Sequence, residues 1–199
     1  MPASIDPAAN VMLIDVELYL DIHDSGALDE RRVELVDGEL IEMHAVTWEH
    51  WWATNQLGRH FVLALAEHRE YSVGQQGGIT AGGYSVPEPD LHVVRLRRAD
   101  FEQRSRRPVS GTVLVGEVSV SSLRWDLGRK RRLYAEAAIP EYWVIDVDGE
   151  RLVVHRDPTE GDYRTVTEHR RGEPVAPAGL PVAPFDLAAA LDPPAGIEA

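Results

Sequence analysis

The sequence predicts an α/β domain with a mixed central β-sheet flanked by helices, and two patterns support this fold class. Several short segments are rich in β-branched residues, whereas two longer segments have the apolar periodicity of a helix. Helix, antiparallel strands, helix and further strands follow in that order. Because 199 residues can bury one core, residues 15–191 are expected to form a single domain. A flexible start at 1–14 and a mobile tail at 192–199 are expected around it.

The N-terminal part should contain a short helix and a β-hairpin. The helix is expected around residues 15–20. Residues 33–43 alternate on both sides of Asp37-Gly38, which is a strong signal for a hairpin turn. This alternation assigns Val33, Leu35, Leu40 and Met43 as core candidates. It leaves Glu34 free either for chemistry or for solvent.

A long helix and two strands should follow. Thr47 can cap a helix that extends to about His68. Glycine-rich residues 71–84 suggest one or two short strands, and residues 91–94 and 112–120 are β-branched runs joined by an arginine-rich loop. The apolar side chains of this first core helix are Trp48, Trp51, Trp52, Phe61, Val62 and Leu65.

The C-terminal half should supply a second helix and three more strands. The helix is expected from Asp126 to about Ala138, since Pro140 must stop it. Asp148-Gly149 is a turn signal between two strands. The strands are expected at 141–147, 151–155 and 163–169, with a short helix at 185–191.

Composition excludes several classes of protein. The absence of cysteine excludes disulfides and thiol catalysis. No basic leader or apolar run of about 18 residues is present, so a cytoplasmic protein that does not enter the membrane is expected. The net charge of −13 argues against a general basic coat for nucleic acid, although residues 95–107 and 124–132 are locally basic. P-loop, nucleophile-elbow and H-E-x-x-H motifs are also absent.

Lys130 is the only lysine among 20 basic residues, and it falls on the apolar side of the second helix. A buried ammonium is costly unless it meets an anion. Upstream candidates are Asp90 and Glu117, while an ion pair with Asp126 is the structural alternative. A compact ammonium differs from a guanidinium because it can deliver a point charge and a proton.

Asp90 begins one predicted strand, and Glu117 lies inside the next. In antiparallel neighbours these carboxylates can face each other, and they would then repel unless one is protonated or a cation lies between them. Oxygen ligands without clustered cysteine or histidine favour Mg²⁺ or Mn²⁺. Lys130 could then orient a water molecule and stabilise the transition state of phosphate attack.

These residues occur in a wider pattern. Pro89-Asp90, Glu117-Val118-Ser119, Asp126, Lys130, Tyr134 and the run from Pro140 to Asp146 resemble the bacterial Uma-type restriction endonuclease family of the PD-(D/E)XK nuclease superfamily. The hairpin run from Glu34 to Leu40 resembles it as well, so the likeness covers roughly residues 15 to 190.

The resemblance implies a restriction-endonuclease-like core and metal-dependent phosphodiester cleavage. It assigns Asp90 and Glu117 as metal ligands. The superfamily's lysine normally stands two residues after the acid, where this chain has Ser119. In the resembling family the cation comes from the following helix, which here corresponds to Lys130.

Further residues, Ser119 among them, are candidates for the same site. Glu34 could add an acidic ligand, or it could lie on a solvated strand face. Asp126 could orient Lys130 from four residues away. His50 could approach the site, although capping or a surface role is favoured, and Tyr134, Tyr142 and Trp143 are expected in the core.

The leading hypothesis is a Mg²⁺- or Mn²⁺-dependent DNA endonuclease, which could work as a homodimer because cutting two strands requires two sites. The first alternative is a nuclease-fold module that binds nucleic acid or regulates without cleaving. The second alternative is an enzyme with the same metal-dependent chemistry that cleaves RNA or another phosphodiester.

Overall fold

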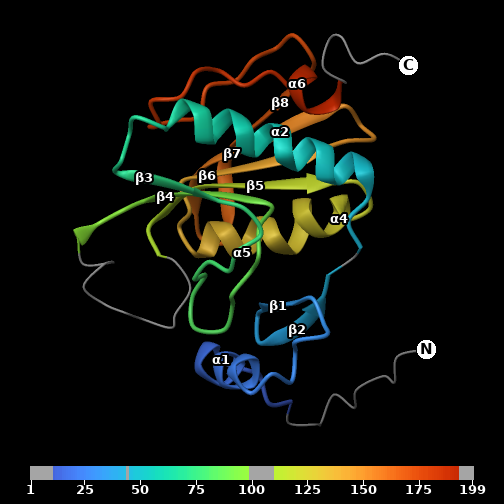
Figure 1. Cartoon of the computed structure of the whole chain (residues 1–199), viewed down its shortest axis with the longest axis vertical. Coiled ribbons are helices and arrows are strands. Elements are labelled where there is room, and N and C mark those ends of the chain that lie inside the picture. Colours follow the sequence, from blue (N-terminus) through green and yellow to red (C-terminus); the bar gives the residue numbers. More distant parts are fainter. Residues whose placement is uncertain (1–10, 44, 99–109, 193–199) are drawn as a thin grey trace.

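The computed structural model describes residues 11–43, 45–98 and 110–192, and Figure 1 shows its arrangement. Its elements in chain order are α1 (Val16–Asp24), β1 (Val33–Val36), β2 (Glu39–Glu42), α2 (Trp48–Ala64), β3 (Tyr71–Gly74), β4 (Leu91–Arg95), β5 (Thr112–Ser119), α4 (Leu123–Trp125), the π-helix η1 (Asp126–Lys130), α5 (Arg131–Glu136), β6 (Glu141–Asp146), β7 (Arg151–Thr159), β8 (Asp162–His169) and α6 (Ala188–Leu191).

A mixed six-stranded sheet forms the centre of the molecule, as the sequence predicts. Its strand order is β3-β4-β5-β6-β7-β8. The β5–β6 pair is parallel, and the other pairs in this sheet are antiparallel. Parallel neighbours need a crossover connection, and α4, η1 and α5 supply it. The helical crossover therefore lies over the strand that carries Glu117.

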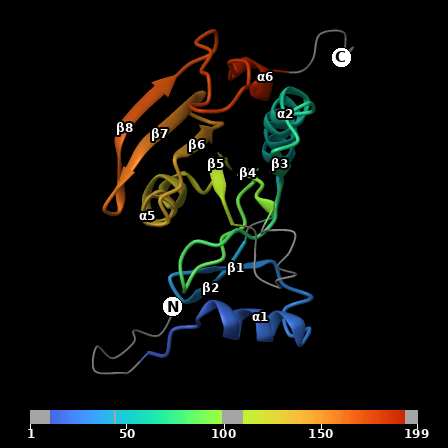
Figure 2. The same ribbon diagram turned by 90° about the vertical axis from the view of Figure 1, so that its left-hand side faces the viewer.

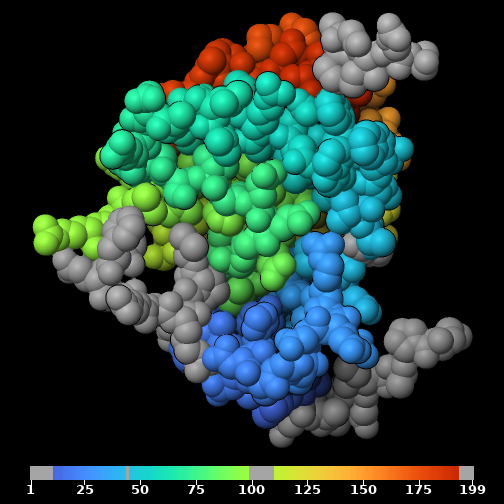
Figure 3. Space-filling view, viewed as in Figure 1, coloured from blue at the N-terminus to red at the C-terminus, as the bar shows by residue number. Residues whose placement is uncertain are grey.

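Helices cover both faces of this sheet (Figure 2). On one face α2 and α6 pack with the sheet around Leu57, Phe61, Trp143 and Phe185, all of which are almost completely buried. On the opposite face α5 packs around Tyr134 and its neighbours. Figure 3 shows α2 extending across one side of the molecule above the N-terminal segment. Successive residues of a strand point to opposite faces, so Val118 joins the α2 core while Glu117 points toward the crossover.

The N-terminal hairpin forms a separate two-stranded sheet, β1-β2. Its turn residues Asp37 and Gly38 have φ angles of 51° and 80°, which is the left-handed geometry of a tight hairpin turn. Leu35 is fully buried against α1 and pairs with Val86 in an isolated bridge. Val33 and Leu40 are only half-buried, so the alternation identified the core side of this hairpin incompletely.

The second helix differs from its predicted form. It begins at Leu123, three residues before the expected start, and it contains the π-helix Asp126–Lys130. Arg131 N donates to Asp126 O in this wider turn. Tyr142 Oη, from β6, donates to the same carbonyl at 3.1 Å. This distant hydroxyl supports a break in the regular helical ladder that local periodicity cannot reveal.

The first long helix is shorter and less buried than predicted. It ends at Ala64, although Thr47 caps it as expected by accepting a hydrogen bond from His50 N at 3.3 Å. Trp48 and Trp51 are 69% and 47% exposed, and Val62 is half exposed. Their assignment to the core was wrong, because α2 buries the side that carries Ala53, Leu57 and Phe61 instead.

Some expectations fall on residues outside the described ranges. These are most of the arginine-rich loop, the first ten residues and residues 193–199. Within the segment expected to be a flexible start, the backbone N–H of Ile14 donates a hydrogen bond to Gly38 O at 3.0 Å, so this residue is bonded to the hairpin turn. Across the described ranges, no helix is both long and apolar enough to cross a membrane.

Candidate active site

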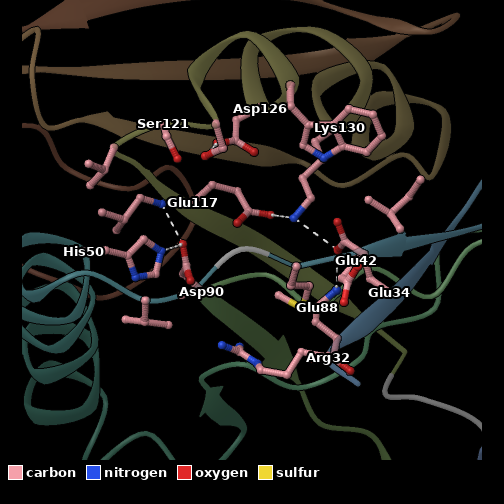
Figure 4. Close-up of a pocket in the computed structure, with 18 of the residues that line it drawn as sticks. Arg32, Glu34, Glu42, His50, Glu88, Asp90, Glu117, Ser121, Asp126 and Lys130 are labelled. Atoms are coloured by element: carbon pink, nitrogen blue, oxygen red, sulfur yellow. Dashed lines mark hydrogen bonds and ion pairs between the residues drawn. The ribbon is translucent and has the colours of Figure 1, made fainter. Parts of the chain in front are cut away.

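Asp90 immediately precedes β4, and Glu117 lies in β5, the antiparallel neighbour of β4. Leu91 pairs with Gly116, so the residues on either side of that pair, Asp90 and Glu117, oppose each other. Asp90 Oδ2 accepts a hydrogen bond from Val118 N at 2.8 Å, which fixes the carboxylate at the start of β4. Both side chains are buried and line the same cavity (Figure 4).

Lys130 reaches this pair from the crossover. Its Nζ lies 2.9 Å from Glu117 Oε1 and 3.2 Å from Glu34 Oε2. Figure 4 shows the ammonium between these two carboxylates. Glu117, one of the two upstream anions that the sequence offers to Lys130, is therefore its partner, and Glu34 is turned inward rather than to solvent.

Asp126 has different partners from those expected. Its Oδ2 accepts hydrogen bonds from Ser119 Oγ at 2.6 Å and from Ser122 Oγ at 2.5 Å. The described contacts of Lys130 Nζ do not include Asp126. Ser119, at the position where the superfamily has its lysine, thus ties β5 to the crossover. Asp126 influences Lys130 through its charge, not through a hydrogen bond.

His50 reaches the site from the first turn of α2. Its Nε2 lies 3.0 Å from Asp90 Oδ2, although the two residues are 40 positions apart. Only the backbone N–H of His50 takes part in the cap of α2. The preference for a capping or surface role of the side chain was therefore wrong, because the docking of α2 on the sheet sets this contact.

Tyr134 also contacts the site, although the sequence assigned it only to the core. It is fully buried, and its Oη donates to Glu117 Oε1 at 2.7 Å. Its spacing of four residues from Lys130 was the available signal, since residues at that spacing share a helix face. Lys130 and Tyr134 therefore both bind one oxygen of Glu117.

The contacts described above use only one oxygen of each carboxylate in the Asp90–Glu117 pair. Among the described residues, no hydrogen-bond donor binds Glu117 Oε2 or Asp90 Oδ1. Neither oxygen is a fully buried atom without a hydrogen-bond partner, so both oxygens are accessible. Each carboxylate thus keeps one oxygen available on the side of the cavity.

Burial and crowding of acidic groups perturb the charges. Burial raises the pKa of Glu117 to about 8; Asp90, Asp126 and Glu34 add to this rise, and Lys130 opposes it. Burial alone would lower the pKa of Lys130, but Glu117 and Glu34 raise it above its ordinary value. Burial also raises the pKa of Asp126. One ammonium therefore faces an excess of carboxylates, which is an environment that attracts a further cation.

The cavity has a volume of about 620 Å³ and lies between the hairpin, the start of α2 and the crossover. Glu88 also faces it, and Glu88 N donates to Glu34 Oε2 at 3.1 Å. The charged side chains that line the cavity, besides His50, are Arg32, Glu34, Glu42, Glu88, Asp90, Glu117, Arg124, Asp126, Arg129 and Lys130.

The donor set fits a hard divalent cation. Two carboxylates, one just before β4 and one in β5, present oxygens that accept no hydrogen bond from the described residues, and Mg²⁺ and Mn²⁺ prefer such ligands. In the described ranges, no preformed group of three or more acidic, histidine or cysteine side chains could hold a metal. Asp90 and Glu117 would therefore hold such an ion together with water or substrate oxygens, as Mg²⁺ sites commonly do.

A mixed sheet with helices on both faces, and acids at the meeting of two central strands, places this protein among restriction-endonuclease-like α/β proteins. The chain belongs to the Uma2 family, which is described as "Putative restriction endonuclease" and whose model matches residues 16–189.

The fold is similar to a solved structure. That structure is the crystal structure of a "putative nuclease belonging to DUF820" from Anabaena variabilis ATCC 29413, with a TM-score of 0.65 and 12% sequence identity. The similarity covers 81% of this chain and 90% of the other. A comparison with curated proteins gives no match.

Proposed function

We propose that this protein is a metal-dependent endonuclease that hydrolyses phosphodiester bonds in DNA. The observation that carries the proposal is the convergence of Asp90, Glu117 and Lys130 in one cavity, with a free oxygen on each carboxylate. Membership of the Uma2 family supports the same reaction class. Mg²⁺ or Mn²⁺ is the proposed cofactor.

Asp90 and Glu117 hold the metal, which when bound lowers the pKa of a water and offsets charge on the phosphate. His50 orients Asp90, and Tyr134 helps to orient Glu117. Lys130 Nζ has three N–H donors; it donates a hydrogen bond to Glu117 Oε1 and forms an ion pair with Glu34. A remaining N–H donor positions the attacking water or binds a phosphate oxygen as negative charge develops.

The test is a cleavage assay with Mg²⁺ or Mn²⁺ on duplex, single-stranded and structured DNA, with RNA as a parallel substrate. Asp90→Ala and Lys130→Ala should each remove activity, whereas Glu67→Ala, an exposed change outside the cavity, should retain it. Activity that survives both site substitutions contradicts the proposal. Cleavage of RNA alone would support the proposed chemistry but would make RNA, and not DNA, the substrate.

A second candidate is a nuclease-fold module that binds nucleic acid or regulates without cleaving. The ion pairs of Lys130 with Glu34 and Glu117, and the serine at position 119, favour it. Titration calorimetry with Mn²⁺ separates the two candidates. Binding that is lost in Glu117→Ala supports the metal site, whereas no binding favours the inactive module.

A further inference from the structure

Two arginines in the cavity differ from the other cations near the site. Arg32 precedes β1 and Arg124 lies in α4, and both line the cavity. Within residues 11–43, 45–98 and 110–192, neither side chain forms a hydrogen bond or an ion pair. By contrast, Arg129 in the same cavity is held by Asp37 at 2.8 Å and by Glu39 at 2.6 Å.

The absence of partners is unexpected for Arg32. Its charge lowers the pKa of Glu88, whose overall pKa is nevertheless raised, first by burial and then by Glu34. Three glutamates line this side of the cavity, yet the guanidinium bonds to none of them. In Figure 4 it extends below Asp90 and away from Glu34 and Glu42. Its five donors are therefore available to an anion in the cavity.

The two arginines come from opposite walls. In Figure 4, Arg32 lies on one side of the Asp90–Glu117 pair, and the crossover that carries Ser121 and Asp126 lies on the other. Arg124 belongs to that crossover, three residues after Ser121. A polyanionic strand that crosses the acidic pair would therefore meet a free guanidinium on each side. Guanidinium groups suit phosphate because they can donate two parallel hydrogen bonds.

Gly128 gives a second, independent indication of an extended ligand. Glycine inside a helix costs about 0.5–1 kcal/mol relative to alanine. A Cβ at Gly128 would meet nothing within 4 Å, whereas a Cβ at Gly58 would lie 2.4 Å from Gln75 Nε2. Internal packing therefore does not require glycine at position 128, which lies in the cavity wall between Asp126 and Lys130. The missing side chain leaves room for a substrate beside the lysine.

We infer that Arg32 and Arg124 bind the phosphates on either side of the scissile one, and that the strand passes over Gly128. The inference rests on the proposed function, because it names how the same cavity holds its substrate. It also explains how a chain of net charge −13 can bind a polyanion. Two free guanidinium groups supply local positive charge where the acidic surroundings would otherwise repel phosphate.

The test measures binding separately from cleavage. Fluorescence anisotropy of a labelled DNA oligonucleotide, without metal and across a range of salt concentrations, is compared for Arg32→Ala, Arg124→Ala and two controls. The controls are Arg31→Ala and Arg132→Ala, which remove exposed arginines close in sequence that do not line the cavity. Each cavity substitution should weaken binding about 5- to 10-fold and reduce the salt slope by about one, whereas the controls should stay within about 2-fold.

Gly128→Leu should weaken binding at least about 10-fold without lowering the melting temperature, and Gly128→Ala should have a smaller effect. Equal losses in the cavity variants and their controls, or no binding by the wild-type protein, would overturn the inference. Cleavage with unchanged KM in Arg32→Ala and Arg124→Ala would overturn it while retaining the proposed function. Binding that depends on both arginines, without any cleavage, would retain the subsites and refute the endonuclease.

Discussion

Glu117 and Glu141 are both buried glutamates on neighbouring strands, but their surroundings differ. Glu117 is 4% exposed and Glu141 is 1% exposed. Glu141 Oε1 accepts from Trp143 Nε1 and from two nitrogens of Arg156, at 2.7–2.9 Å. Its Oε2 accepts from Ala178 N at 2.6 Å. Both oxygens of Glu141 therefore accept hydrogen bonds, whereas the described residues donate to Glu117 through Oε1 alone.

The difference separates a structural carboxylate from one that is available for chemistry. Glu141 is paired with a guanidinium and joins β6 to β7 and to the segment around Ala178. Glu117 shares its ammonium with Glu34 and keeps one oxygen free on the side of the cavity. Burial alone does not distinguish the two glutamates; the number of donors around each carboxylate oxygen does so.

The largest contrast should appear when each glutamate is replaced by glutamine. Glu117→Gln should lower metal-dependent cleavage at least about 100-fold, because the neutral amide is a poor metal ligand. Its free energy of unfolding should change by no more than about 1 kcal/mol, since the substitution also removes a crowded buried acid. Cleavage kinetics and urea denaturation measure the two effects.

Glu141→Gln should have the opposite profile. It should lose about 3 kcal/mol of unfolding free energy, because Arg156 loses its charged partner. The specific activity of the folded protein should remain within about 2-fold of wild type. If Glu141→Gln abolished cleavage while Glu117→Gln retained it, the distinction between the two glutamates would be wrong.

Lys130→Met should destabilise the fold by about 3–5 kcal/mol, because two buried carboxylates lose their cation. Adding Glu34→Gln should restore part of this loss, since one uncompensated charge disappears. Thermal and urea unfolding of the single and double variants measure the coupling. Purely additive effects would contradict a shared ion pair.

His155 tests how burial affects a basic side chain that forms no ion pair among the described residues. Burial lowers its pKa to about 4, from an ordinary value of 6.5. The unfolded chain binds this proton first, so folding stability should fall as the pH drops from about 6.5 to 4, by up to about 3 kcal/mol. Urea unfolding across this range should show a shallower loss for His155→Gln than for wild type. Parallel curves would remove His155 as the cause.

Ser119→Ala should have the smallest effect. Asp126 loses one hydrogen bond and keeps the one from Ser122, so about 1 kcal/mol of stability is expected to disappear. Mn²⁺ affinity measured by calorimetry should stay within about 3-fold of wild type. A loss of metal binding as large as that in Glu117→Gln would show that Ser119 acts directly at the metal.

The candidate site could be predicted from the sequence only in part. The strand after Asp90 and the strand that carries Glu117 are recognisable from β-branched runs, and the buried position of Lys130 from helical periodicity. The contact between His50 and Asp90 is not, because it depends on how α2 packs against the sheet. Trp48 and Trp51 show the same limit: apolar side chains predict burial, but the orientation of the helix leaves these two exposed.

The sequence by itself determined the order of the elements, the hairpin turn at Asp37-Gly38 and the residue types that can bind a hard cation. These features depend on local backbone preference and on side-chain chemistry. Only the tertiary structure decided that Lys130 lies between Glu34 and Glu117, that Asp126 binds two serines, and which carboxylate oxygens remain free. The physical reason is that hydrogen-bond partners are selected by packing between elements far apart in the chain, as with Tyr142 Oη and the carbonyl of Asp126.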